Sequence, residues 1–167
     1  MKDSAGEARS ATLRWTVPGG GYAGSRTLSG LDCLRGWRDG SLTMPPVGQV
    51  LGVQFGEIEH GRLTLTMPLR DFMTNDWGVV LGGMVASALD VALGCVVMTV
   101  VPAECDVASL DLRVEFLRPV RDGSVVVEAE CVHVDRHRTL AIARLTTPDG
   151  RLCAVGTSSG LIRPKRQ

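Results

Sequence analysis

Residues 75–90 read Asn-Asp-Trp-Gly-Val-Val-Leu-Gly-Gly-Met-Val-Ala-Ser-Ala-Leu-Asp, and they open the most apolar part of the chain. The 25 residues from 77 to 101 carry one charge, that of Asp90. A run of this length could span a bilayer, but a central carboxylate, several dispersed glycines and the lack of flanking basic clusters argue against a span. We therefore predict one long core helix that is buried nearly all round.

The segments on either side of this helix alternate between apolar and polar residues, as strands do. The clearest case is 109–117, where Leu110, Leu112, Val114 and Phe116 share one face and charged residues the other. We predict strands over 47–57 and 62–69 before the long helix, and over 109–117, 124–135, 139–147 and 152–162 after it.

Turn signals connect these strands. A short amphipathic helix is expected over 29–40, and Pro45-Pro46 is expected to end it. A turn at His60-Gly61 joins the first two strands, and the steps Asp122-Gly123 and Asp149-Gly150 are typical of hairpins. The order is short helix, two strands, long helix, four strands. This order predicts an α+β fold in which an antiparallel sheet wraps around one long central helix.

The chain has 167 residues, enough for one domain with a sizeable core. Residues 1–30 are rich in Gly, Ser and Arg and have no periodicity. We therefore predict a flexible N-terminal arm over 1–30 and a single domain over 31–167. No apolar signal segment follows the first residues, so we expect a cytoplasmic protein.

Composition argues against several classes of partner. Eighteen basic and 18 acidic residues give a formal net charge of zero, and aromatic residues make up 4% of the chain. Such a chain is not expected to bind nucleic acid or a membrane surface. The five cysteines have no C-x-x-C spacing, which disfavours disulfides and zinc and fits a reducing cytosol. His133 and His137 lack a spacing partner, so we expect no metal.

Gly82, Gly83 and Asp90 suggest acyl-group chemistry. The first N–H groups of a helix have no intrahelical partner, and glycine leaves them open to a developing negative charge. Asp90 stands among apolar residues, where a carboxylate is costly unless it is used or paired. The alternatives are structural: Asp90 could form a helix–helix hydrogen bond, and Gly82 could serve only tight helix packing.

Gly82 and Asp90 are eight residues apart, which is ~12 Å along a helix axis. An oxyanion donor and a base must both lie within about 3 Å of the reacting atoms. The two residues can therefore hardly serve one carbonyl within a single chain. A two-fold dimer with antiparallel helices would bring Gly82 of one subunit opposite Asp90 of the other. We expect a homo-oligomer, either a dimer or a dimer of dimers.

Several features together resemble the hotdog-fold acyl-CoA thioesterases, specifically the phenylacetate-pathway type, over roughly residues 30 to 162. They are Asn75 followed by Gly82 and Asp90 at seven and fifteen positions, the Gly-Gly-Met-Val-Ala-Ser-Ala-Leu-Asp helix opening, the segment 109–119 that ends in Leu-Arg-Pro, and Arg136-His137-Arg138-Thr139 followed by a strand and Asp149-Gly150. The resemblance implies a hotdog fold and hydrolysis of an acyl-CoA or acyl-carrier thioester. Coenzyme A is then part of the substrate, and no separate cofactor is expected.

The resemblance also implies active sites shared across a dimer interface, with Asn75 and Gly82 from one chain and Asp90 and Ser109 from its mate. Gly82 is then the oxyanion donor and Asp90 the nucleophile or general base. Asn75 would orient the attacking water, or else cap a turn. Ser109 would hold the water or bond Asp90, or else be an ordinary strand serine.

Coenzyme A needs cations for its phosphates and a backbone edge for its pantetheine. Two segments match the family's CoA-contacting positions. They are Phe116, Arg118, Pro119 and Arg121 in the first segment, and Arg136, His137, Arg138 and Thr139 in the second. For any one of these residues, a solvated loop position is the alternative.

One departure from the family concerns the residue before Gly82. The family usually has His-Gly-Gly there, whereas this chain has Leu81-Gly82-Gly83. The change puts rate and substrate preference in question, and a non-catalytic acyl-CoA-binding or sensor protein is the alternative function. A hotdog dehydratase is disfavoured, because its central helix needs a His and no His lies between His60 and His133.

Overall fold

The computed structural model describes residues 7–17 and 27–165. Its helices are α1 (Gly30–Asp39), α2 (Pro46–Leu51), the short 3-10 helix η2 (Asp71–Met73) and α3 (Gly82–Met98). Its strands are β1 (Gln54–Glu59), β2 (Arg62–Pro68), β3 (Cys105–Ser109), β4 (Arg113–Phe116), β5 (Ser124–Val134), β6 (Arg138–Thr146) and β7 (Leu152–Pro164). Within these residues the strands form one antiparallel sheet in the order β1-β2-β5-β6-β7-β3, and β4 also pairs with β7.

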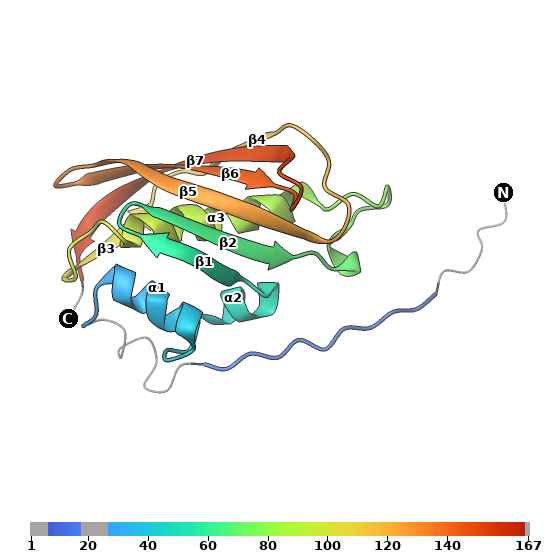
Figure 1. Cartoon of the computed structure of the whole chain (residues 1–167), viewed down its shortest axis with the longest axis horizontal. Helices are drawn as coiled ribbons and strands as arrows, with labels where there is room; N and C mark the ends of the chain where they lie inside the picture. The colour runs from blue at the N-terminus through green and yellow to red at the C-terminus, as the bar shows by residue number, and fades with distance from the viewer. Residues whose placement is uncertain (1–6, 18–26, 166–167) are drawn as a thin grey trace.

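The sheet curls around α3, while α1 and α2 lie below α3 in the view of Figure 1. This arrangement confirms the predicted α+β hotdog fold. The inner side chains of α3, among them Leu89 and Leu93, are almost fully buried against the sheet. Gly156 in β7 lets the helix approach, because a Cβ there would lie 3.3 Å from the Leu93 side chain. Over the described residues, no helix combines the length and the apolarity that a bilayer span needs.

The first two helices show one correct and one wrong prediction. α1 begins where expected, and the Ser29 hydroxyl caps it by accepting from the Asp32 N–H at 3.1 Å. The strand predicted from 47 is wrong at its start, because Pro46 begins a second helix, α2, and β1 begins only at Gln54. A proline at the first helical position loses no hydrogen bond, so Pro45-Pro46 starts a helix here.

The predicted strand 109–117 is also wrong in its bounds. β3 ends at Ser109 and β4 begins at Arg113, so the expected strand is two strands with a break between them. Asp111 lies in the break, where its carboxylate accepts from the Ser159 N–H at 3.0 Å. Of the alternating apolar residues, Val114 packs against the core, whereas Leu110 is 49% exposed and Phe116 is 58% exposed, so they do not form one continuous buried face.

The turns confirm two of the three predicted hairpins. Gly61 and Gly150 adopt φ values of 79° and 84° and connect β1 to β2 and β6 to β7. Asp122-Gly123 is also a turn, with φ of 79° at Gly123, but it is not a hairpin. β4 pairs with β7, whereas β5 pairs with β2 and β6, so the two strands flanking this turn are not neighbours.

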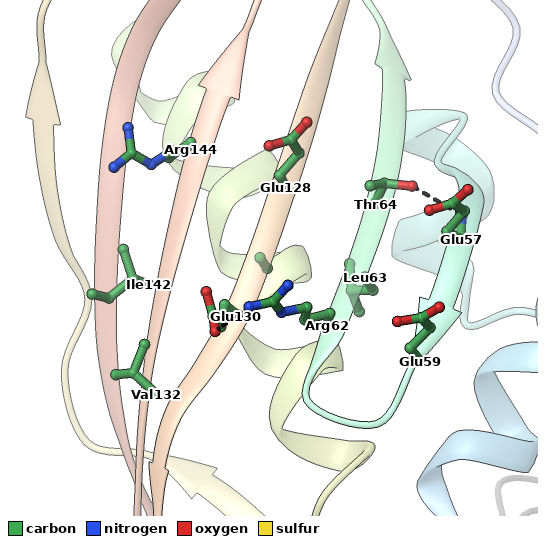
Figure 2. A pocket seen from close by; sticks show the side chains of 11 residues that line it. Glu57, Glu59, Arg62, Leu63, Thr64, Glu128, Glu130, Val132, Ile142 and Arg144 are labelled. Atoms are coloured by element: carbon green, nitrogen blue, oxygen red, sulfur yellow. Dashed lines mark hydrogen bonds and ion pairs between the residues drawn. The ribbon is translucent and has the colours of Figure 1, made fainter.

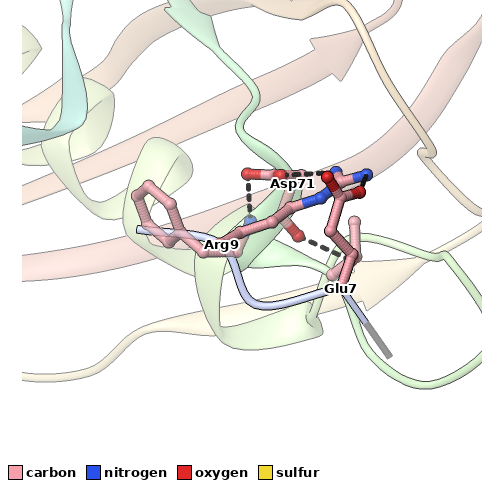
Figure 3. Close-up of polar contacts among 5 residues, drawn as sticks. Glu7, Arg9 and Asp71 are labelled. Carbon is pink, nitrogen blue, oxygen red and sulfur yellow. Dashed lines mark hydrogen bonds and ion pairs between the residues drawn. The ribbon is translucent and has the colours of Figure 1, made fainter. Parts of the chain in front are cut away.

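Part of the predicted N-terminal arm, residues 7–17, runs in an extended conformation along the domain. Gln49 in α2 binds the arm through two 2.8 Å hydrogen bonds: its side chain accepts from the Thr16 N–H and donates to the Thr16 carbonyl. Arg9 donates to Asp71 at 2.8 Å, as Figure 3 shows, and this bond lowers the pKa of Asp71 below its usual value. Residues 1–6 and 18–26 lie outside the described part, and the flexibility of the arm stays a prediction.

Candidate active site

The first two backbone N–H groups of α3 have no acceptor in the described part of the chain. Leu81 occupies the N-cap position with no side-chain hydrogen bond to the helix, and Gly82 and Gly83 follow it. Within the described residues, no acceptor takes up the N–H of Gly82 or Gly83. The chain just before them is fixed, because Leu81 donates to the Met73 carbonyl and Val80 to the Val120 carbonyl, each at 2.8 Å. The helix therefore presents rigidly held, unused donors at its positive end.

Asn75 organises the loop that leads to this helix. Its side-chain oxygen accepts from the N–H groups of Trp77 at 3.0 Å and Val79 at 3.1 Å. Gly78 completes the turn with a φ of 65°, which glycine adopts without strain. The side-chain oxygen of Asn75 thus caps a turn, which is the structural role that the sequence offered as the alternative to orienting water. The side-chain amide has no hydrogen-bond acceptor in the described part of the chain, so it remains available as a donor.

Five of the predicted site residues line one cavity of about 320 Å³ at the start of α3: Asn75, Gly82, Phe116, Arg118 and Pro119. The walls of this cavity come from two segments that are far apart in sequence. One is the loop and helix start over 75–85, and the other is the end of β4 and the loop after it, over 116–120. The Phe116 ring packs against Gly82, and a Cβ at position 82 would lie 3.1 Å from its Cζ atom. A backbone donor, an amide and a guanidinium therefore surround one space.

Two arginines lie beside this cavity. Arg118 donates one N–H to the Leu152 carbonyl at 2.9 Å, and Arg121 donates one to the Trp77 carbonyl at 3.1 Å. Both side chains are held in place by these bonds while each guanidinium has further N–H groups to offer. Such anchored guanidinium groups are suited to bind phosphate oxygens.

Asp90 lies away from this cavity, two turns further along α3, and is exposed in the isolated chain. It makes no hydrogen bond or ion pair with any described residue. Instead it lines a second cavity of about 200 Å³ together with apolar side chains from α1, α2, β1 and α3. Burial raises the pKa of the nearby Cys95 thiol to about 12, and the negative charge of Asp90 contributes to this shift to a lesser extent. Asp90 is therefore an unpaired carboxylate on an open helix face.

The remaining predicted residues lie elsewhere in the chain. Ser109 ends β3 opposite Gly160 of β7, and its hydroxyl has no partner among the described residues. Arg136 and His137 form the exposed turn between β5 and β6, and Arg138 begins β6. Thr139 is 1% exposed, so its side chain is not available to a ligand in this chain.

The two predicted CoA-contacting segments lie at opposite ends of the sheet. Phe116 pairs with Ala154 of β7, and Arg138 pairs with Leu161 of the same strand. Seven residues of strand separate these two positions, which is about 23 Å. One chain therefore does not bring the two segments together. Among the described residues, no group of three His, Cys, Asp or Glu side chains is arranged to hold a metal ion.

A third cavity, of about 480 Å³, lies on the face of the sheet that points away from α3 (Figure 2). Charged side chains of β1, β2, β5 and β6 line it, and Arg62 and Glu130 form a 2.9 Å ion pair within it. It contains none of the predicted site residues and no helix N-terminus. The chemistry at the start of α3 makes the first cavity the better candidate site.

Sequence reasoning missed the apolar walls of both α3 cavities. Val120 lines the first cavity with Gly82, its side chain is buried, and its carbonyl accepts from the Val80 N–H. In the sequence, the only signal for Val120 is its position directly after Arg118 and Pro119. Met44 and Val47 line the second cavity from the segment around α2, part of which was predicted as a strand. Their role becomes visible only when that segment is folded against α3.

Comparisons with known proteins identify a family for this chain. A family model described as the thioesterase superfamily matches residues 78–154. An esterase proposed in Halobacterium salinarum is 33% identical over 103 residues, which cover 59% of this chain and 68% of that protein. The medium/long-chain acyl-CoA thioesterase YigI of Salmonella typhimurium is 26% identical over 132 residues, which cover 70% of this chain and 85% of that protein.

The fold comparison points the same way. A crystal structure from Ralstonia eutropha, described as a proposed thioesterase related to phenylacetic acid degradation, superposes with a TM-score of 0.72 at 25% identity. The superposition covers 76% of this chain and 97% of that chain. The match therefore extends over nearly the whole of the solved chain.

Proposed function

Because the chain belongs to the thioesterase superfamily, we propose that it is an acyl-CoA thioesterase, which hydrolyses the thioester to a free acid and coenzyme A. The observation that carries this proposal is the unpaired N–H of Gly82 in a cavity that also holds Asn75 and Arg118. A donor fixed at a helix N-terminus stabilises the oxyanion that forms when a thioester carbonyl is attacked.

In the proposed reaction the thioester carbonyl oxygen accepts from the Gly82 N–H. The Asp90 carboxylate acts as general base, removing a proton from water as the water attacks the carbonyl carbon. If Asp90 acts instead as nucleophile, it forms a mixed anhydride with the acyl group, which water then hydrolyses to the free acid and the regenerated carboxylate. Collapse of the tetrahedral intermediate breaks the C–S bond and releases the thiolate of coenzyme A. The side-chain amide of Asn75, which lines the same cavity as Gly82, would orient the water or the carbonyl.

The proposal requires two chains. Gly82 and Asp90 are ~12 Å apart along α3, and Asp90 faces away from the first cavity toward the second. An antiparallel pair of α3 helices about a two-fold axis would place the partner's Asp90 next to Gly82. The same axis would bring Ser109 of the mate to that site. The exposed, unpaired state of Asp90 in the single chain supports such a shared site.

A partner chain would also complete the coenzyme A site. Arg118 and Arg121 lie by the first cavity, whereas Arg136, His137 and Arg138 lie about 23 Å away in the same chain. We propose that the phosphates contact Arg118 and Arg121 of one subunit and the Arg136–Arg138 turn of the other. Phe116 and Pro119 would flank the pantetheine, since both line the cavity that contains Gly82.

A non-catalytic acyl-CoA-binding protein is the second candidate function. The observation that favours it is Leu81, whose apolar side chain occupies the position before Gly82 and is 55% exposed. Leu81 cannot donate a hydrogen bond to the thioester. This alternative keeps the same binding residues but lacks turnover.

The proposal is tested with a panel of aliphatic and aryl acyl-CoA esters and acyl-carrier thioesters, with detection of the free thiol. Thiol release from CoA esters that is abolished in Asp90→Asn supports the enzyme. Faster thiol release from acyl-carrier thioesters than from CoA esters would indicate that the natural substrate is attached to a carrier protein. Binding of acyl-CoA in a calorimeter without thiol release would support the non-catalytic acyl-CoA-binding function instead.

A further inference from the structure

The second cavity of α3 has an unusual combination of one carboxylate and an apolar interior. We infer that it receives the acyl group of the thioester, and that Gly94 sets the size of the acyl group that fits. The inference rests on the proposed function and adds to it a substrate class: uncharged, apolar acyl groups of medium size.

The cavity lies between two layers of the fold. Trp37 of α1, Met44 and Val47 form one side, Phe55 of β1 closes it, and Gly94 and Cys95 of α3 form the other side. Among the described residues that line it, Asp90 alone is charged. Trp37 and Phe55 stack with ring centroids 6.4 Å apart, which gives the cavity a fixed aromatic wall.

Asp90 and Gly94 follow one another along one face of α3. They are four residues apart, so they lie on the same face, about 6 Å from one another along the axis. A thioester whose carbonyl is attacked beside Asp90 can extend its acyl group along this face toward Gly94 and away from Gly82 of the same helix. This direction leads into the apolar cavity and leaves the coenzyme A end at the helix start of the partner.

Within the described part of the single chain, no neighbouring atom requires residue 94 to be glycine. A Cβ at this position would meet no atom within 4 Å, whereas a Cβ at Gly156 would meet Leu93 at 3.3 Å. Glycine inside a helix costs about 1 kcal/mol relative to alanine. The chain therefore keeps open a space beside Asp90 that it could fill with a stabilising methyl group, as expected if a ligand occupies that space.

The size and polarity of the cavity define the acyl class. An apolar cavity of about 150 Å³ holds a benzene molecule, and this cavity has about 200 Å³. It suits an aryl ring with one or two further carbons, or a chain of roughly six to eight carbons. Burial keeps the Cys95 thiol protonated, so this wall stays uncharged. A dicarboxylic acyl group would be rejected, because its free carboxylate would be desolvated near Asp90.

The test compares the hydrolysis of butyryl-, hexanoyl-, octanoyl- and phenylacetyl-CoA by the wild-type dimer and by Gly94→Ala and Gly94→Leu variants. We expect Gly94→Leu to lower kcat/KM for octanoyl- and phenylacetyl-CoA at least tenfold and to leave butyryl-CoA within about threefold. Gly94→Ala should give a smaller shift in the same direction. Met44→Ala widens the opposite wall and should shift the preference toward longer chains.

Two outcomes overturn the inference. One is an equal loss for all chain lengths in Gly94→Leu with an intact dimer. The other is dissociation of the dimer by both Gly94 variants, because Gly94 would then serve helix–helix packing. A binding readout separates the inference from the proposed function: the same chain-length shift in calorimetric acyl-CoA affinity, measured in an Asp90→Asn background, supports the acyl cavity even if the wild type releases no thiol.

Discussion

The ring of Phe116 lies so close to Gly82 that a Cβ at position 82 would be 3.1 Å from its Cζ atom. The contact joins the start of α3 to the loop after β4, two segments that separately carry the predicted oxyanion donor and the predicted coenzyme A contacts. This distance is shorter than a Cβ usually tolerates, so a side chain at residue 82 would push the Phe116 ring slightly away.

Gly82→Pro removes the N–H without removing the helix. Proline is favoured at the first helical position, and Leu81 already has the extended ψ of 136° that a following proline requires. We expect a folded protein whose kcat is lower by on the order of 100-fold or more, the usual cost of one oxyanion donor. Gly82→Ala is the control, since it keeps the N–H and disturbs only Phe116. Equal activity of wild type and Gly82→Pro would remove Gly82 from the mechanism.

Asp90→Asn tests the carboxylate. Asp90 has no hydrogen-bond or ionic partner in the described part of the chain, so the fold does not depend on its charge. We expect kcat to fall on the order of 100-fold or more, with a melting temperature within about 2 °C of the wild type. Glu104→Gln, at another exposed acidic residue, should change neither value. Unchanged turnover in Asp90→Asn would mean that this carboxylate has no chemical role.

Mixing the two inactive variants tests the shared site. A heterodimer of an Asp90→Asn chain and a Gly82→Pro chain has one site with an intact Gly82 and an intact Asp90 if the two residues act across the interface. We expect activity to return on subunit exchange, up to about one quarter of the wild-type level for random mixing. Proven exchange without recovery would place both residues in the same chain's site.

Leu81→His introduces the histidine that usually precedes the Gly-Gly pair in the family that this chain resembles. The Leu81 side chain is exposed at the N-cap position, so a polar ring should shift the melting temperature by less than about 2 °C. We expect a higher kcat/KM for a simple acyl-CoA, because the ring can contact the thioester carbonyl or a water molecule. A folded variant that is no faster on any substrate would show that Leu81 belongs to the binding surface instead.

The contribution of the turn between β5 and β6 to the stability of the fold should decrease in acid. Hydrogen bonds from the N–H groups of His137 and Arg138, and a contact with His133, lower the pKa of Asp135 to about 2. Since the folded value lies below the unfolded value of about 3.9, this contribution to stability is complete above pH ~4 and is lost as the pH falls toward 2. We expect Asp135→Asn to be less stable than the wild type in urea at pH 7 and to match it near pH 2. A constant difference across this range would exclude the carboxylate as its source.

The periodic parts of the fold could be predicted from the sequence. α3 follows from its apolar run, and β5, β6 and β7 follow from alternation and the turn at Gly150, because one buried face repeats along each element. The failures have local causes. Pro46 can begin a helix as well as prevent one, and Gly123 specifies a reversal of the chain without specifying which strands pair after it. Strand pairing depends on the whole sheet.

The candidate site was predictable only in part. Asn75, Gly82 and Arg118 were identified from the sequence and do line one cavity. The open position of Asp90 was not, since an apolar stretch of sequence suggests burial and cannot show that one helix face is left uncovered. The cavity beside Gly94 was also beyond sequence reasoning, because its walls come from three segments that are distant along the chain.

Gln49 has a consequence for how the N-terminal segment can change over evolutionary time. It holds Thr16 entirely through the backbone, accepting from its N–H and donating to its carbonyl at 2.8 Å. Every residue except proline offers the same two groups. The identity of residue 16 is thus free to drift, while a change at Gln49 would release the segment whatever its sequence. Homologous chains should vary at the anchored position and hold the glutamine constant.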